Sequence, residues 1–135
     1  MSIKRTDALR VAVLASGRGS NLQAVIDAIA AETVQAKIVA VISNKKDAPA
    51  LERARRQGLS DLFVDPKPYA GRPDGREAYD RELLDVLRRH DVELVLLAGY
   101  MKIVTKGLVE TFTNRMMNIH PSLLPSFPGL DVQKK

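Results

Sequence analysis

The chain has 135 residues, 45% of them hydrophobic and 27% charged, which fits one globular domain and excludes a disordered or fibrous protein. It has no cysteine, which excludes disulfides, thiolate metal sites and a cysteine nucleophile, and two histidines alone make a poor zinc site. The net charge of +5 is interspersed with acidic residues and aromatic side chains are few, so we expect no nucleic-acid partner.

The first half of the chain alternates apolar runs with an amphipathic pattern. Residues 10–15 are a β-branched run that ends in Ser-Gly, which is typical of a strand buried on both faces. A helix is predicted from Asn21 onward, with Ser20 as its N-cap and Gln23 completing a capping box. Residues 37–42 are the second predicted strand. A second helix is predicted to be capped by Asp47 and closed by Gly58.

The same alternation continues in the second half. Residues 61–64 are predicted as a short strand, and the three prolines and two glycines of residues 65–75 predict an irregular loop. Asp74 and Glu77 form a second capping-box pattern, opening a helix that runs to His90. Strands at 92–98 and 116–119 flank a short helix at 106–111. The order predicts an α/β, Rossmann-like doubly wound, mainly parallel sheet with helices on both faces.

A glycine-rich turn, SGRGSNL at residues 16–22, lies between the first strand and the first helix. Gly17 and Gly19 allow close approach of a ligand, and the free N–H groups at a helix start favour an anion, so we interpret the turn as a phosphate site. It lacks the Lys-Ser/Thr of a P-loop and the third glycine of the dinucleotide fingerprint, so neither ATP nor NAD is favoured. A turn that serves only as a compact connection remains the alternative.

Two further loops are predicted to lie near this turn. Residues 98–101 follow the fourth strand and residues 118–121 follow the fifth. In a doubly wound sheet the ends of the first and fourth strands flank the switch point, where ligands bind. We therefore expect all three loops to converge at one edge of the sheet.

Asn118 and His120 end the fifth predicted strand with one apolar residue between them. Alternation along a strand directs both side chains to the same side, where an amide and an imidazole suit acyl transfer. Asn118 would donate to a developing oxyanion, and His120 would stabilise it and relay a proton. A histidine that only binds backbone carbonyls is the alternative. His90 follows Arg88 and Arg89 at the end of an amphipathic helix, where we interpret it as a surface residue that interacts with the helix dipole, and it is assigned no catalytic role.

Five segments resemble the glycinamide ribonucleotide formyltransferases. They are SGRGSNLQAVIDAI, VISNKKDAPALERARRQG, GREAYDREL, LAGYMKIV and MNIHPSLLPSFPGL, which together run from about Leu9 to Leu130. The resemblance implies the formyltransferase fold. It also implies transfer of a formyl group from the co-substrate 10-formyltetrahydrofolate to the amine of glycinamide ribonucleotide, in purine synthesis and without a metal.

The resemblance also implies residue roles. Asn118 and His120 would be catalytic. The substrate site would comprise Gly17, Gly19, Ser20, Asn21, Gly99, Met101 and Pro121, with the phosphate at residues 19–21. The folate would be bordered by Arg76, Leu97, Met101, Lys102, Ile103, Val104, Val109 and Asn118. The apolar members of this set would also be core residues in any such fold.

Two departures from the family pattern stand out. Lys102 occupies a position where arginine is frequent, which replaces a planar fork with a point charge. Family members also continue to a DGG-type loop whose aspartate assists proton transfer, and no residue after Leu130 can supply it. We therefore expect residues 1–135 to be a truncated N-terminal formyltransferase domain without its C-terminal strands, impaired in formyl transfer. The sequence predicts no oligomeric state.

Three alternatives compete with this interpretation. Another formyltetrahydrofolate enzyme, such as a deformylating hydrolase or an initiator-tRNA formyltransferase, is disfavoured because the turn at 16–22 suits a small phosphate ester. A catalytically inert nucleotide-binding module remains open. A nicotinamide-dependent dehydrogenase is disfavoured because no acidic residue ends the second strand. With no signal segment and no apolar run near the roughly 20 residues that span a bilayer, we expect a cytoplasmic protein without a membrane partner.

Overall fold

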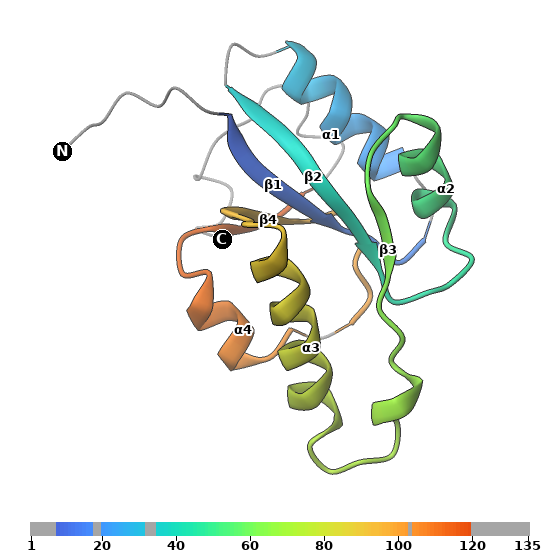
Figure 1. The fold of residues 1–135 in the computed structure, drawn as a ribbon, viewed down its shortest axis with the longest axis vertical. Coiled ribbons are helices and arrows are strands. Elements are labelled where there is room, and N and C mark those ends of the chain that lie inside the picture. The colour runs from blue at the N-terminus through green and yellow to red at the C-terminus, as the bar shows by residue number, and fades with distance from the viewer. Residues whose placement is uncertain (1–7, 18–19, 32–34, 103, 120–135) are drawn as a thin grey trace, which may run out of the picture.

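The computed structural model describes residues 8–17, 20–31, 35–102 and 104–119, and for Ser20 and Asn21 it describes the backbone alone (Figure 1). Five strands form one sheet in the order β3-β2-β1-β4-β5. They are β1 (Leu9–Leu14), β2 (Ala36–Ser43), β3 (Asp61–Phe63), β4 (Leu94–Leu97) and β5 (Met116–Asn118). Every pairing in this sheet is parallel, so the predicted doubly wound sheet is confirmed.

Helices cover both faces of the sheet, as Figure 1 shows. They are α1 (Ser20–Ala31), α2 (Pro49–Arg56), α3 (Gly75–Arg89) and α4 (Lys106–Thr111). Alternate residues of β1 enter the two apolar cores. Val11 and Val13 pack with α1 and α2, whereas Ala12 and Leu14 pack with α3 and α4. β1 is buried on both faces because it lies in the middle of the sheet, which explains its uninterrupted apolar sequence.

Two predicted helix caps differ from the structure, those of α2 and α3. At α1 the amide of Gln23 donates to Asp27 and its oxygen accepts from Arg53, and the side chain of its predicted partner Ser20 lies outside the described part of the chain. The N-cap of α2 is Ala48 rather than Asp47, and Pro49 follows it at the first turn, where the missing N–H needs no partner. Asp74 is the N-cap residue of α3, as predicted, but its side chain makes no capping hydrogen bond.

The reason at Asp74 is a competing cation. Both carboxylate oxygens of Asp74 accept from Arg72, at 3.0 and 2.9 Å, and this guanidinium lowers the pKa of Asp74. The loop around it also contains one short 3₁₀ helix, η1 (Lys67–Tyr69), where we expected no regular structure. Gly58 adopts a φ of +76° just after α2, which confirms the predicted left-handed closure.

Candidate active site

The carboxyl ends of parallel strands share one edge of the sheet, and two of the three predicted loops meet there at β1 and β4. β1 pairs with β2 on one side and with β4 on the other. The chain thus reverses its direction of travel across the sheet between β1 and β4, which makes this the switch point. The loops that follow the two strands are hydrogen-bonded to each other through Ser16, Gly99 and Met101.

Ser16, the first residue of the glycine-rich turn, joins these loops. Its side chain is 2% exposed. The hydroxyl donates to Oδ1 of Asn44 at 2.7 Å and accepts from the N–H of Met101 at 2.7 Å. The N–H of Ser16 donates to the carbonyl of Gly99 at 3.2 Å. The ends of β1, β2 and β4 are therefore tied together by one small buried side chain.

The rest of the predicted phosphate turn leads into α1. The carbonyl of Gly17 accepts from the N–H of Ala50, which fixes the turn against the start of α2. No acidic residue lies in the first turn of α1, so no carboxylate there competes with an anion for the helix start. Gly19 and the side chains of Ser20 and Asn21 lie outside the described part of the chain.

The loop after β4 begins with a glycine that its backbone requires. Gly99 has a φ of +76°, a conformation that other residues rarely adopt. Met101 follows with its side chain 76% exposed. Lys102 turns back, so that its ammonium lies 4.6 Å from the centroid of the Tyr79 ring, within cation–π distance. Ile103 is outside the described residues.

The far end of this loop is held by Asp80 of α3. The carboxylate is buried, at 5% exposure, and accepts from both the N–H and the hydroxyl of Thr105 at 2.8 Å. Thr105 is the N-cap position of α4, so Asp80 fixes the start of that helix. Nearby, burial raises the pKa values of Tyr79 and Tyr100, so both phenols stay protonated over the physiological range.

The end of β5 lies next to the end of β4. Leu97 is opposite Asn118 in the register, and the N–H of Ile119 donates to the carbonyl of Leu97 at 2.9 Å. Met117 and Ile119 are buried in the core beneath α1 and α2. By alternation, Asn118 is directed to the opposite face, and it is exposed. His120 and Pro121 lie outside the described residues, so their predicted places are not described.

The other predicted folate residues are spread over α3, α4 and the loop between β4 and α4. Leu97 and Val104 are partly buried against the core beneath α3 and α4. Val109 is 45% exposed on α4. Arg76 is exposed in the first turn of α3, and its guanidinium makes no hydrogen bond or ion pair with the described residues. The structure thus brings Leu97 next to Asn118, whereas Arg76 lies on α3 and Val109 on α4.

A cavity of about 850 Å³ opens on the other side of Ser16, toward β2 and β3. It is lined by Ser16, Asn44, Lys45, Lys46, Asp47, Ala48, Pro49, Phe63, Asp65, Pro66 and Lys67. Apart from Ser16, which belongs to the predicted phosphate turn, none of these is a predicted site residue. The switch point, which lies toward β4, is the better candidate, because the loops that follow β1 and β4 are joined there through Ser16.

Sequence patterns missed three polar residues that shape this edge, namely Ser16, Asn44 and Asp80. Asp80 had a signal, because it falls on the apolar stripe of its helix with Leu83 and Leu87, three and seven residues later. A carboxylate on a buried stripe needs partners, and this predicts a structural or functional contact. Ser16 had no such signal, because a serine after a strand is ordinary turn chemistry.

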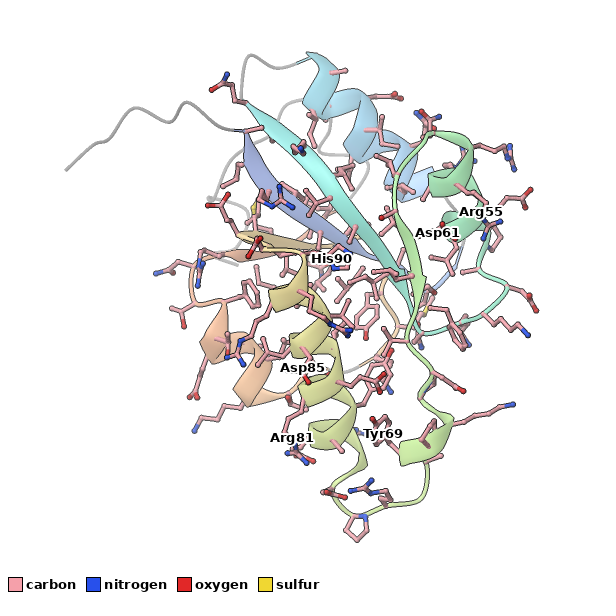
Figure 2. The ribbon with its side chains drawn as sticks, in the orientation of Figure 1. Arg55, Asp61, Tyr69, Arg81, Asp85 and His90 are labelled. Atoms are coloured by element: carbon pink, nitrogen blue, oxygen red, sulfur yellow. The ribbon has the colours of Figure 1, made fainter. Side chains whose placement is uncertain are left out.

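The described residues contain no group of three or more His, Cys, Asp or Glu that could hold a metal ion. In the same ranges, no helix has the length and apolar character needed to cross a bilayer. The only other histidine, His90, lies at the end of α3, where Nδ1 is 2.9 Å from the carbonyl of Val86 (Figure 2). The carbonyl of His90 accepts from the guanidinium of Arg10 near the start of β1, so His90 lies toward the amino ends of the strands and away from the switch point.

The chain is similar to known proteins over most of its length. A family model described as formyl transferase matches residues 9–135. The chain is 43% identical over 127 residues to the phosphoribosylglycinamide formyltransferase of Escherichia coli (strain K12), covering 94% of this chain and 58% of that protein. It is 50% identical over 128 residues to the trifunctional purine biosynthetic protein adenosine-3 of Drosophila pseudoobscura pseudoobscura, covering 93% of this chain and 9% of that protein.

Solved structures agree with the sequence comparison. The glycinamide ribonucleotide transformylase 1 from Symbiobacterium toebii is similar with a TM-score of 0.76 and 44% identity, covering 96% of this chain and 59% of that one. The phosphoribosylglycinamide formyltransferase from Brucella melitensis is similar with a TM-score of 0.76 and 36% identity, covering 93% and 64%. The chain thus spans less than two thirds of the length of each of these relatives.

Proposed function

The chain belongs to the formyl transferase family, and from this premise we propose that it carries the formyl-transfer site for glycinamide ribonucleotide, with 10-formyltetrahydrofolate as the formyl donor, in purine synthesis. The three relatives described above that are named for this activity are 36–44% identical to the chain. The small-molecule acceptor and a cytoplasmic location are part of the proposal.

One observation carries it. The glycine-rich turn before α1 is hydrogen-bonded through Ser16 to the loop after β4, at the switch point of a parallel sheet. A phosphate at the start of α1 would then lie within reach of groups on the ends of β4 and β5. The acceptor and the donor of the formyl group would thus bind to neighbouring loops, the acceptor to the glycine-rich turn and the donor to the loop after β4.

The acceptor would bind along the turn and across the neighbouring strand ends. Its phosphate would accept hydrogen bonds from the backbone at Gly19, Ser20 and Asn21. Gly17, Gly99, Met101 and Pro121 would border the rest of the substrate. The absence of acidic residues from the first turn of α1 supports an anion at this position.

The donor would bind beside the loop between β4 and α4. A folate has a flat apolar ring system and an acidic tail, so it needs apolar surface together with cations. The exposed Met101 and Val109 and the partly buried Leu97 and Val104 supply apolar surface. Ile103 would add to this surface. Lys102 and the unpaired guanidinium of Arg76 supply positive charge for the carboxylates.

Chemistry would take place at the end of β5. As the amine of the acceptor attacks the formyl carbon, negative charge develops on the formyl oxygen. Asn118 would donate a hydrogen bond to that oxygen, and His120, when protonated, would stabilise the charge and relay a proton from the amine to the departing nitrogen of the donor. Each such contact is typically worth two to four powers of ten in rate, by order of magnitude.

The test compares the two histidines of the chain. Formyl transfer and binding of glycinamide ribonucleotide are measured for wild type, His120→Ala and His90→Ala. We expect His120→Ala to lose about 100-fold or more in transfer rate while retaining acceptor binding. His90→Ala is the matched control, and its transfer rate should match wild type.

Three results would contradict the proposal. Equal transfer rates for wild type and His120→Ala would remove the catalytic role of this residue. Acceptor binding without any transfer by wild type would favour the nucleotide-binding module instead. A wild-type protein that binds no glycinamide ribonucleotide would exclude both.

A further inference from the structure

We propose that Ser16 is a positioning residue that holds the donor loop, defined as residues 98–105 between β4 and α4, against the glycine-rich turn, so that binding of one substrate strengthens binding of the other. This inference rests on the proposed function. It concerns the first residue of the glycine-rich turn, which lies outside the phosphate-binding residues 19–21 and outside the catalytic pair. Ser16 touches no reacting atom in this proposal and acts only through the two loops that it joins.

The hydroxyl of Ser16 acts both as a hydrogen-bond donor and as an acceptor. It donates to Oδ1 of Asn44 and accepts from the N–H of Met101, at 2.7 Å in each case. Because the side chain is 2% exposed, water does not compete for either bond. The bond to Asn44 orients the hydroxyl, so its lone pair faces the donor loop. The position of Met101 is therefore set by a side chain of the turn.

The donor loop has two attachments, and they come from different parts of the fold. Its carboxyl end is held by Asp80 through two hydrogen bonds to Thr105. Its amino end is held by Ser16 through Gly99 and Met101. The Met101 side chain is 76% exposed, so packing contributes little to its position. Loss of the Ser16 hydroxyl should therefore release the amino half of the loop and leave the carboxyl half on α3.

The same hydrogen bonds provide the coupling. Ser16 directly precedes Gly17, and the Gly17 carbonyl is bound to Ala50 at the start of α2. A phosphate that orders the turn also orders the backbone of Ser16, and through its hydroxyl the amide of Met101. A ligand on the donor loop then binds to a loop that is already ordered, which strengthens its binding. By reciprocity, the donor strengthens binding of the acceptor by the same factor.

Ser43 offers a matched control. It too is a buried serine at the carboxyl end of a central strand, and its hydroxyl also accepts from a backbone N–H, that of Lys45, at 3.1 Å. Its partner is two residues away, so Ser43→Ala removes a buried hydroxyl without separating two loops. Both substitutions delete one oxygen atom from a buried site, so both should have similar effects on folding.

The experiment is calorimetric titration of tetrahydrofolate, the product that cannot transfer a formyl group, with and without saturating glycinamide ribonucleotide. For wild type and Ser43→Ala, we expect the acceptor to tighten tetrahydrofolate binding by about fivefold or more. For Ser16→Ala, the ratio of the two dissociation constants should fall close to one. A purely structural role for Ser16 would weaken both affinities and leave the ratio unchanged.

Further arms keep the test decisive. Asn44→Ala removes the acceptor that orients the hydroxyl, and should lower the ratio in the same direction if Ser16→Ala fails to fold. An unchanged ratio in whichever of these variants folds, or no coupling in wild type, overturns this inference alone. If wild type binds neither ligand, the proposed function fails and this inference fails with it.

Discussion

Replacing Asp80 by alanine tests how the start of α4 is fixed. The carboxylate is buried and accepts two hydrogen bonds of 2.8 Å from Thr105. Hydrogen bonds to charged groups contribute about 1.5–3 kcal/mol each, so their sum is about 3–6 kcal/mol. Removing a buried charge also recovers part of its desolvation cost. We therefore expect Asp80→Ala to lower the free energy of unfolding by about 2–4 kcal/mol.

Urea unfolding followed by circular dichroism measures this loss. With a slope of about 2 kcal/mol per molar urea, the midpoint should fall by about 1–2 M. Asp85→Ala is the matched control, because Asp85 lies on the same helix, carries the same charge and is exposed (Figure 2). It should change the free energy of unfolding by less than about 0.5 kcal/mol. Equal midpoints for the two variants would refute the role assigned to the Asp80–Thr105 contact.

The remaining predictions concern the tyrosines and two glycines. Burial raises the pKa of Tyr79 and Tyr100, and the hydrogen bond to Glu82 raises that of Tyr69. These raised values stabilise the fold below the ordinary tyrosine pKa of about 10 and cease to do so as the pH rises further, so tyrosinate absorbance should appear together with unfolding. Tyrosinate absorbance at full amplitude in still-folded protein near pH 10 would contradict this. Gly75→Ala should lower the free energy of unfolding by about 1–3 kcal/mol and so lower the melting temperature, because the new Cβ would collide with the carbonyl of Tyr69. Gly107→Ala, in open space on α4, should instead raise stability by about 0.5–1 kcal/mol, and a thermal scan that ranks the two variants the other way would be evidence against both.

The strands were predictable because each is a local apolar run. Residues 10–15 and 37–42 were expected as strands, and β1 and β2 lie within one or two residues of those bounds. The short helix at 106–111 was predicted at its observed bounds. Alternation of strands and helices then leaves few topologies, because crossovers between parallel strands are right-handed. The family also followed from motifs in the sequence, and the comparisons confirm it.

Helix caps were less predictable, because side chains near a helix start choose among several partners. Asp74 has the sequence pattern of a capping box, yet Arg72 takes its carboxylate. Gln23 is likewise taken by Asp27 and by Arg53, which is 30 residues away. A capping pattern spans only four residues, so it contains no information about a side chain of another helix that binds the same group.

The sequence by itself determined the elements, the fold class and the family, because hydrophobic period, turn residues and motif order are properties of neighbouring residues. Only the tertiary structure decided that Ser16 meets Asn44 and Met101, which are 28 and 85 residues away, and that Asp80 meets Thr105, 25 residues away. Such partners depend on how strands pair and on which face each helix covers. A buried hydroxyl or carboxylate takes whatever donor or acceptor the assembled fold brings within hydrogen-bond distance.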